Sequence, residues 1–381
     1  MHSNPFSDDE LSLRLVATRQ EMAVRGLDLV LLSAPEHVFY LTGLDHWGYF
    51  APHVLIVAAE GELVLVTRAM EHVAIRNQVR NATFIGHSDS ESAADVVVKH
   101  LNGASSGKTI GLESASAGLS YAMGQALKQG IDGASWVDIT GMLDEMRLVK
   151  SIEEQRFMRS AAVASDAGTQ AAINAIHDGA KEADVAAECL AAMTRAGGTP
   201  PGFGPFLRPS HRMAEEHTTW GDGEHHEAVF LEIAGCVARY NAPMGRLVNI
   251  GRISDEDAEM ARICGEAFDA TLRALKVGAR AKDVYSGWQS VVDAAGMPEY
   301  RRHHCGYLVG IGFPPAWTDG PRVTGLRHDS DREMREGMTF HLMSWFTETG
   351  RGNYFISNTV LLGADGAEVL TTTPYGPHIA P

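Results

Sequence analysis

The hydrophobic pattern of the chain changes character near residue 150, and this change constrains the fold more than any other feature. Before it, short apolar runs at residues 27–33 and 109–112 alternate with segments of helical spacing, such as residues 9–25. This alternation predicts a mixed α/β domain over residues 1–150.

Beyond that point the pattern is one of long helices followed by strand-like segments. Ser151 and Glu154 form a capping-box signature, which predicts the start of a helix. Residues 197–210 are dense in Gly and Pro and are predicted to form a turn or loop. The later segments predict helices laid on an antiparallel, curved sheet, so residues 151–381 form an α+β domain.

Charge and cysteine usage limit the possible partners and compartment. The chain has 32 Lys+Arg against 48 Asp+Glu, a formal net charge of −16, which argues against nucleic acid and anionic membranes. Four scattered cysteines, no secretory signal and no apolar run near ~18 residues predict a cytoplasmic protein that does not enter the membrane. The 17 histidines among so many acids raise the question of a metal site.

One carboxylate stands in an apolar segment. Glu232 lies within Val-Phe-Leu-Glu-Ile-Ala-Gly, where burying a charge is costly, and His217 and Trp220 precede it. It is either a functional group, a residue on an exposed strand face, or a residue paired with Arg239 or Arg246. The alternating neighbours on its face are apolar, which favours the functional reading.

A glycine-rich segment at residues 303–317 is the second candidate. Its glycines permit close backbone approach, so a histidine and Tyr307 can face a shared cavity. Because adjacent strand residues point to opposite faces, at most one of His303 and His304 is expected to line it. The alternative is a strand packed on a helix with both histidines at the surface. No helix signal follows Gly310 and Gly312, which argues against a dinucleotide fingerprint.

Two further segments remain open between function and packing. His341 lies in an apolar strand, where a histidine is either a hydrogen-bonded core residue or a site residue. Trp47, Tyr49 and Phe50 lie in a Gly/aromatic loop after the strand-like residues 40–43. That loop is either a hydrophobic plug or a lid over a small ligand.

Taken together, these segments resemble the pita-bread superfamily of creatinase, prolidase, aminopeptidase P and methionine aminopeptidase. Further signs are Tyr-Leu-Thr-Gly at 40–43, Met-Arg-Leu-Val-Lys-Ser-Ile-Glu-Glu at 146–154 and Gly-Ala-Glu-Val-Leu-Thr at 366–371. The resemblance implies an α/β N-terminal creatinase-like domain followed by an α+β pita-bread catalytic domain. It also implies a homodimer in which an N-terminal loop reaches the partner's site.

The resemblance also answers the metal question position by position. The peptidases of this superfamily bind two metals through two Asp, one His and two Glu. The matching positions here hold Glu232, Pro243, Tyr307, Met343 and either Ser357 or Asn358. Pro, Tyr and Met are poor substitutes for those ligands, so we expect no metal and no other cofactor.

Within the superfamily the chain resembles the metal-free branch, which includes creatinase and ectoine hydrolase. This implies Glu232 as nucleophile or general base, His217 as its acid–base partner and Tyr307 as a hydrogen-bond donor, with His341 orienting the substrate. The implied substrate-binding residues are Trp220, Tyr240, Asn241, His304, Trp47, Tyr49, Phe50 and Trp317. Three departures bear on the substrate: Gly245 replaces a creatinase glutamate, Asn241 a histidine and Asn358 a glutamate of the ectoine hydrolase pattern.

The predicted function is therefore metal-independent hydrolysis of a C–N bond in a small amidine, guanidine or compatible solute. The first alternative is a metal-dependent Xaa-Pro peptidase of the same fold. The others are a lyase acting on a small zwitterion and a non-catalytic binding module.

Overall fold

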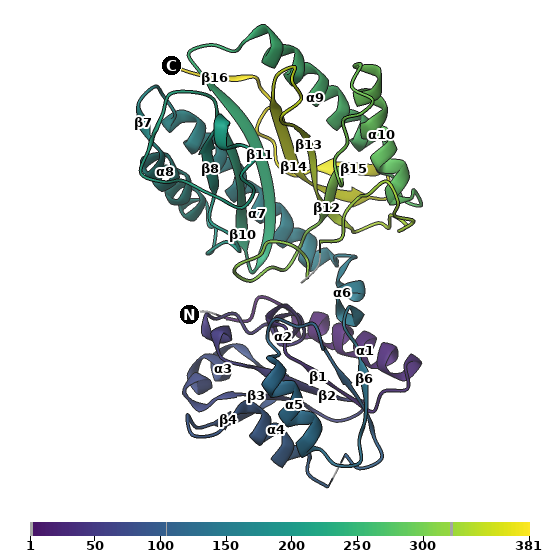
Figure 1. Cartoon of the computed structure of the whole chain (residues 1–381). Coiled ribbons are helices and arrows are strands. Elements are labelled where there is room, and N and C mark those ends of the chain that lie inside the picture. Colours follow the sequence, from purple (N-terminus) through teal and green to yellow (C-terminus); the bar gives the residue numbers. More distant parts are fainter. Residues whose placement is uncertain (1–2, 104, 321–322) are drawn as a thin grey trace. The chain divides into compact units, whose positions relative to one another are not determined.

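The computed structural model describes residues 3–103, 105–320 and 323–381 and divides the chain into two compact units, Met1–Arg147 and Leu148–Pro381 (Figure 1). The junction lies at the point where the sequence pattern changes. Each unit has its own sheet, and each is described by itself below.

The N-terminal unit is a mixed sheet with helices packed against it. Its strand order is β4-β3-β2-β1-β5-β6, in which β1, β5 and β6 are parallel and β2 is antiparallel to both of its neighbours. The elements are α1 (Asp8–Val24), β1 (Leu29–Leu32), α2 (Pro35–Thr42), η1 (Gly48–Phe50), β2 (Val54–Ala58), β3 (Leu63–Arg68), η2 (Ala69–Glu71), α3 (His72–Gln78), β4 (Ala82–His87), α4 (Ala93–Leu101), β5 (Thr109–Leu112), α5 (Tyr121–Gly130), β6 (Ser135–Asp138) and α6 (Met142–Arg147).

The predicted α/β class is confirmed for this unit, and one local prediction is wrong. Residues 40–43 are not strand-like: Tyr40 to Thr42 form the last turn of α2, and Gly43 closes the helix with a φ of 72°. The left-handed conformation of Gly43 is the usual helix stop. Tyr-Leu-Thr before a glycine fits a short strand as well as a helix end, so the pattern alone did not separate them.

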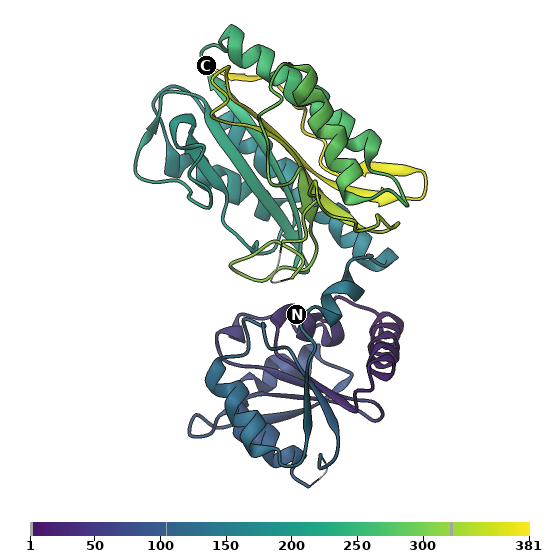
Figure 2. The ribbon, with the colours of Figure 1, turned by 45° about the vertical axis from the view of Figure 1, so that its right-hand side comes forward.

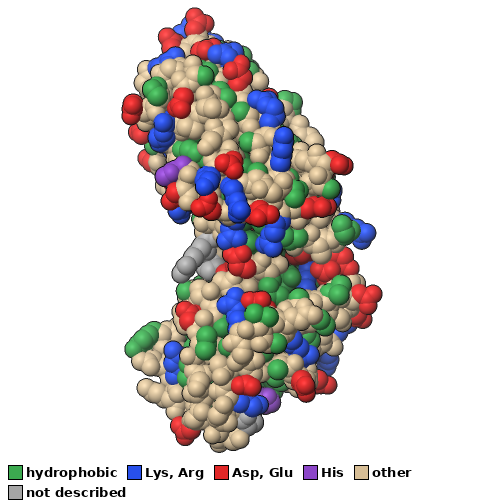
Figure 3. All heavy atoms as spheres, turned by 90° about the vertical axis from the view of Figure 1, so that its right-hand side faces the viewer, with side chains coloured by type: hydrophobic (Ala, Val, Ile, Leu, Met, Phe, Trp, Pro, Cys, Tyr) green, Lys and Arg blue, Asp and Glu red, His purple; other side chains and the backbone are tan. Residues whose placement is uncertain are grey.

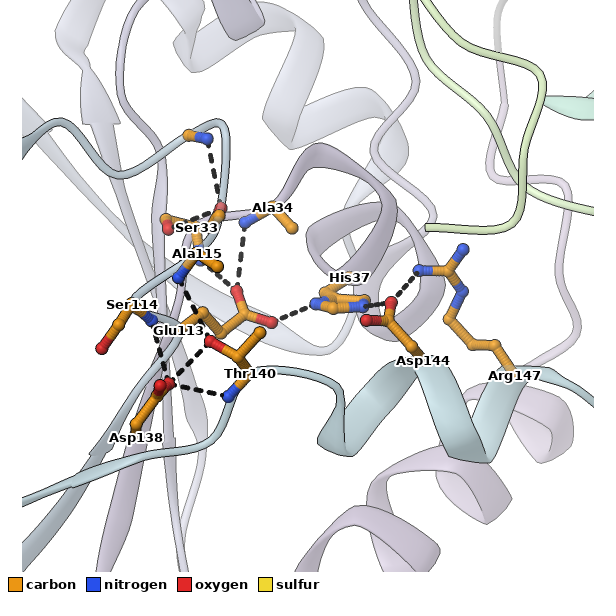
Figure 4. Close-up of polar contacts among 12 residues, drawn as sticks. Ser33, Ala34, His37, Glu113, Ser114, Ala115, Asp138, Thr140, Asp144 and Arg147 are labelled. Atoms are coloured by element: carbon orange, nitrogen blue, oxygen red, sulfur yellow. Dashed lines mark hydrogen bonds and ion pairs between the residues drawn. The ribbon is translucent and has the colours of Figure 1, made fainter. Parts of the chain in front are cut away.

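Carboxylates of the chain itself occupy the carboxyl edge of β1, β5 and β6 (Figure 4). Glu113 accepts hydrogen bonds from the backbone N–H groups of Ser33 and Ala34 at 2.9 and 3.2 Å. In open α/β sheets this edge is where ligands usually bind. Asp138 likewise accepts from the backbone N–H of Thr140 at 2.9 Å. The N–H groups that would cradle an anion here are therefore already satisfied.

The C-terminal unit is a long antiparallel sheet with two pairs of helices packed on it (Figures 1 and 2). The strand order is β12-β13-β14-β11-β10-β8, with β15 added beside β14 and β16 beside β11. Its elements are α7 (Ile152–Ala175), β7 (Ala180–Lys181), α8 (Glu182–Arg195), β8 (Phe206–Pro209), η3 (Ser210–Arg212), β9 (Glu224–His225), β10 (Val229–Val237), β11 (Tyr240–Ile250), α9 (Asp255–Ala274), α10 (Ala281–Ala294), β12 (Gly306–Leu308), β13 (Thr339–Phe346), β14 (Tyr354–Gly363), β15 (Gly366–Val369) and β16 (His378–Ala380).

Local signals and packing both support the helices of this unit. Ser151 and Glu154 form the capping box that begins α7, as predicted. The helix packs on β10 and β11, and small residues permit a close approach: a Cβ on Gly235 would lie 2.3 Å from the carbonyl oxygen of Ala161. A buried apolar cluster that includes Val185 and Ile233 fills this layer. The α+β class of the unit is confirmed.

One element of this unit was predicted wrongly. Residues 197–210 are not all loop, because Phe206–Pro209 forms β8 and pairs with β10 from Val229 to Glu232. The dense Gly and Pro content hid this four-residue edge strand. Pro209 is compatible with it because the strand has a ladder on one side only.

On the face shown in Figure 3, acidic side chains are spread out rather than gathered in one place. Figure 3 shows Asp and Glu side chains across the face in view, with Lys and Arg among them. In the part of the chain that the structure describes, no helix is long and apolar enough to cross a membrane.

Candidate active site

The C-terminal unit contains a cavity of about 710 Å³. Acidic, basic and aromatic side chains share its wall, and they come from β8, β10, β12, β13 and the connecting loops. Five residues selected from the sequence line it: His217, Glu232, His304, Tyr307 and Trp317. This mixture of apolar walls and a few polar groups is typical of a small-molecule site.

Glu232 is the carboxylate buried deepest in the wall. It lies on β10 opposite Gly245 of β11 and Phe206 of β8, and only 6% of the residue is exposed. Burial raises its pKa to about 7; Arg208 opposes this rise and Glu216 adds to it. A carboxyl group with that pKa is present in both protonation states near neutral pH, which suits it to acid–base chemistry.

A row of hydrogen-bonded side chains lies beside Glu232. The register of β12 and β13 sets Tyr307 opposite His341, with the Tyr307 hydroxyl 2.9 Å from Nδ1 of the histidine. The indole N–H of Trp317 donates to the same hydroxyl oxygen at 2.8 Å. On its other side, Nε2 of His341 lies 2.7 Å from Oγ of Ser357 and 3.9 Å from Oε1 of Glu232.

These groups are neutral at pH 7. Burial lowers the pKa of His341 to about 3, and the nearby His304 lowers it further. Burial also raises the pKa of Tyr307 well above its usual value of 10, and the Glu232 carboxylate adds to that rise. Tyr307 therefore keeps its proton. That proton is free to donate into the cavity in the tautomer in which Nδ1–H of His341 donates to the phenol oxygen. His341 lies behind the cavity wall rather than on it.

His217 lines the cavity in an unusual backbone conformation. Its φ is 62°, in the left-handed region that a non-glycine residue seldom adopts. The ring lies among aromatic side chains, with centroids 6.1 Å from Phe206 and 6.4 Å from Phe203. Strained conformations of this kind persist where the surroundings impose them, and they are common at functional sites.

Both members of the His303-His304 pair line the cavity, so the prediction that at most one does is wrong. The alternation rule does not apply, because β12 begins only at Gly306 and both histidines lie in the preceding loop. Their ring centroids are 4.1 Å apart. Burial lowers the pKa of His304 to about 3.

Several cavity residues were not selected from the sequence. Arg208 on β8 is 1% exposed, stacks over Phe230 at 4.3 Å and donates to backbone carbonyls, including that of Met213 at 3.1 Å. Burial lowers its pKa, and the charge of Glu232 opposes this effect. An arginine inside the apolar run Phe-Leu-Arg-Pro was the available signal. Also missed were Phe203, Phe206, Glu216, Arg302 and Trp345.

Tyr240, Asn241 and Trp220 do not line the cavity, which corrects their assignment to substrate binding. The Tyr240 hydroxyl donates to Oε1 of Glu154 at 2.7 Å, on the side of β11 that packs against α7. The Asn241 amide oxygen accepts from the backbone N–H of Gly202 at 3.1 Å. Trp220 packs at the edge of the buried cluster between α8 and the sheet. These three residues support the backbone around the site.

The aromatic loop belongs to the N-terminal unit and contributes nothing to the described lining of this cavity. Trp47 and Phe50 are 63% and 81% exposed, whereas the Tyr49 hydroxyl donates to the backbone carbonyl of Leu44 at 3.1 Å. Two large aromatic side chains are thus left at the surface of that unit.

The fold is that of a two-domain pita-bread protein. Residues 156–364 match the model of metallopeptidase family M24, and residues 14–149 match the creatinase/prolidase N-terminal domain. Because the first match covers more than half of the chain, the protein belongs to the M24 family.

Relatives of this chain have different activities. It is 28% identical to the ectoine hydrolase of Halomonas elongata, over 98% of both chains, and 24% identical to the Xaa-Pro dipeptidase of Pyrococcus furiosus, over 92% of this chain and 95% of that one. The Xaa-Pro dipeptidase from Bacillus anthracis has the same fold, with a TM-score of 0.84 at 21% identity, over 97% of this chain and 99% of that one. The family and these relatives support a hydrolase activity.

The residues at the family's metal positions do not fit a pair of metal ions. Glu232 is the one carboxylate there; Tyr307 supplies a phenol and Met343 a thioether, and the Ser357 hydroxyl is bonded to His341. Hard divalent cations need carboxylates or imidazoles in their place. Over residues 3–103, 105–320 and 323–381, no three His, Cys, Asp or Glu side chains form a cluster able to hold a metal.

Proposed function

We propose that the protein is a metal-independent hydrolase that cleaves a C–N bond of a small amidine, guanidine or compatible solute. The observation that carries the proposal is Glu232, the single carboxylate left at the family's metal positions, buried in the cavity wall with its pKa raised to about 7. A carboxylate in that environment acts on a substrate carbon without help from a metal.

Glu232 has two possible roles at an electron-poor amidine carbon. As a general base it removes a proton from water, and the resulting oxygen attacks the carbon; as a nucleophile it forms the bond itself and water then releases it. In both routes the C–N bond breaks as the departing nitrogen takes up a proton. His217 supplies that proton, because its imidazole lines the same cavity and a ring nitrogen can carry and release a proton.

Tyr307 and its partners stabilise the tetrahedral species. The raised pKa of the phenol keeps its proton in place, so the hydroxyl can donate to charge that develops on the substrate. Trp317 and His341 hold the Tyr307 oxygen from two sides at 2.8 and 2.9 Å. His341 acts through Tyr307 and is therefore a positioning residue. Trp317 also forms an apolar wall with Phe203 and Phe206, at centroid distances of 5.0 and 5.2 Å.

A metal-dependent Xaa-Pro peptidase is the competing function, and a chelator experiment separates the two. Turnover is measured with and without excess chelator, with Glu232→Gln as the inactive control and metal content measured on the purified protein. Metal independence predicts equal rates with and without chelator. Activity that vanishes on chelation and returns with manganese contradicts it.

The substrate is identified by a direct screen. Ectoine, hydroxyectoine, creatine and guanidino acids are incubated with the protein, and the products are measured by mass spectrometry. Products whose combined mass exceeds that of the substrate by one water support hydrolysis. Products whose combined mass equals that of the substrate, one of them with a new double bond, support a lyase. No turnover of any compound, with a tightly held ligand instead, supports the binding-module alternative.

We further propose a cytoplasmic homodimer in which the exposed loop with Trp47 and Phe50 lies near the partner's cavity. The exposure of both side chains supports this placement. Light scattering of the wild type and of Trp47→Ser/Phe50→Ser tests it. A monomeric wild type contradicts it.

A further inference from the structure

A buried ion pair lies next to the loop that carries Trp317. Lys150 and Asp319 form a salt bridge, and the side chain of each is only 1% exposed. The Lys150 ammonium group also lies 3.4 Å from the backbone carbonyl of Leu148. The function proposed above gives this pair no role, and a fully buried ion pair is costly to maintain.

The lysine is fixed by the backbone around it. The backbone N–H of Lys150 donates to the carbonyl of Gly337 at 2.9 Å. The two neighbouring residues, Val149 and Met338, form an isolated antiparallel bridge. Gly310 leaves room for the pair, because a Cβ there would lie 2.8 Å from Cε of Lys150 and 2.9 Å from Cγ of Asp319. The backbone of Lys150 is therefore held next to the residues that precede β13.

The aspartate belongs to the segment that forms one wall of the cavity. Asp319 follows Thr318 and Trp317, which both line the cavity. The segment packs closely: a Cβ on Gly312 would lie 2.6 Å from the carbonyl oxygen of Ala316. The salt bridge at Asp319 thus limits where the Trp317 ring can lie.

We propose that Lys150 and Asp319 are positioning residues that hold Trp317 so that its indole N–H reaches Tyr307. Lys150 is paired with Asp319, Asp319 lies two residues from Trp317 along the chain, and Trp317 donates to the Tyr307 hydroxyl. A shift of about 1 Å in Trp317 would break that hydrogen bond, whose length is 2.8 Å. The catalytic part of this inference rests on the proposed function, whereas the structural part does not.

The test separates positioning from stability. Lys150→Met alone removes the cation next to a buried carboxylate and is expected to destabilise the fold, whereas Lys150→Met/Asp319→Leu replaces both charges by apolar groups and is expected to regain the melting temperature. The protein is labelled with 5-fluorotryptophan, and the Trp317 resonance is assigned by its loss in Trp317→Phe. We expect the ¹⁹F resonance of Trp317 to move by more than its linewidth in the double variant, with the other tryptophans unchanged.

Activity on the compound found by the screen gives the second readout. Misplacement of a site group by about 1 Å lowers rates by about 100-fold, so we expect kcat of the double variant to fall by about that factor and KM to stay within about twofold. A double variant that regains the melting temperature together with the wild-type resonance and kcat overturns the proposal. If no compound is turned over by the wild type, the proposed function fails, but the resonance still decides the positioning.

Two controls complete the design. Arg14→Met removes a buried ion pair of the N-terminal unit, with Glu10 at 2.9 Å, and is expected to lower stability without moving the Trp317 resonance. Asp319→Asn keeps the size of the side chain without its charge, and covers the case in which Lys150→Met does not fold. A Trp317 resonance that moves equally in Arg14→Met contradicts a specific role for the Lys150–Asp319 pair.

Discussion

Two buried histidines, one in each unit, have opposite protonation states. His37 lies between carboxylates: Nδ1 contacts Glu113, and Nε2 is 3.0 Å from Asp144 (Figure 4). Burial alone lowers its pKa, but the charges of Glu113 and Asp144 outweigh burial and raise the pKa to about 9. Both ring nitrogens of His341 are hydrogen-bonded to hydroxyl groups, those of Tyr307 and Ser357, and burial lowers its pKa to about 3.

The comparison teaches that the neighbours decide what a buried histidine does. His37⁺ compensates two carboxylates and binds α6 to the carboxyl edge of the N-terminal sheet. Neutral His341 donates a hydrogen bond from one ring nitrogen and accepts one at the other, and it sets the direction of the Tyr307 hydroxyl. The first histidine is an electrostatic structural element, and the second supports a candidate active site.

Replacing each histidine by glutamine is expected to give the largest difference. His37→Gln removes the cation beside the buried Glu113 carboxylate, whereas Arg147 still lies 3.6 Å from Asp144, and should cost about 3–5 kcal/mol of unfolding free energy. His341→Gln removes only neutral hydrogen bonds and should cost about 1–3 kcal/mol. Urea-induced unfolding followed by circular dichroism measures both. Equal losses for the two variants would contradict the assigned charge states.

The pH dependence of stability should separate the histidines in the same way. The folded-state pKa of His37 is raised from 6.5 to about 9, so its contribution is complete below about pH 6.5 and is lost as pH rises through 9. The expected loss is on the order of 3 kcal/mol. The pKa of His341 is lowered to about 3, so its neutral form is favoured by folding and stability falls from pH 6.5 toward 3.

Melting temperatures of the wild type and the two glutamine variants between pH 4 and 10 check this prediction. His37→Gln should flatten the alkaline limb alone, and His341→Gln should flatten the acid limb alone. The reverse assignment would refute the model of both sites.

The activity should follow the ionisation of the carboxyl group next to His341. Glu232 must be deprotonated to act as base or nucleophile, and its pKa is raised to about 7. We therefore expect kcat/KM to rise with pH through about 7, and at pH 5 to be about 100-fold below its maximum. Steady-state rates across this range measure the profile. An unchanged rate at pH 5 would exclude Glu232 as the group that titrates.

Much of the fold was predictable from the sequence, because periodicity and caps are local signals. The change near residue 150, the capping box of Ser151 and the two fold classes all depend on neighbours in the chain. β8 was missed because its four residues follow a Gly/Pro-rich stretch and are ordered by β10, which is distant in sequence. An edge strand of this kind is set by its partner rather than by its own propensity.

The site was predictable only where a residue type was costly in its local context. Glu232 is conspicuous because a carboxylate in an apolar strand needs a reason. Tyr240 and Asn241 were selected from a resemblance of motifs, which carries no information on the direction of a side chain. Arg302 was missed because it becomes a cavity residue only through tertiary packing, whereas Arg208 was missed because its apolar run was taken as part of a loop.

The smallest expected effect on activity is that of Tyr240→Phe, which is compared with Tyr307→Phe because both are buried tyrosines of the C-terminal unit. Tyr240 donates to the Glu154 carboxylate away from the cavity, whereas Tyr307 lines the cavity and bonds to neutral His341. Tyr240→Phe should cost about 1–3 kcal/mol of stability, because it leaves a buried carboxylate with one donor fewer, and should change kcat and KM by less than about twofold. Tyr307→Phe should instead lower kcat by about 100-fold, the usual cost of losing an oriented donor to the transition state. Steady-state kinetics and thermal unfolding of the two matched variants decide the point, and a lower kcat in Tyr240→Phe at unchanged stability would return that residue to the substrate site.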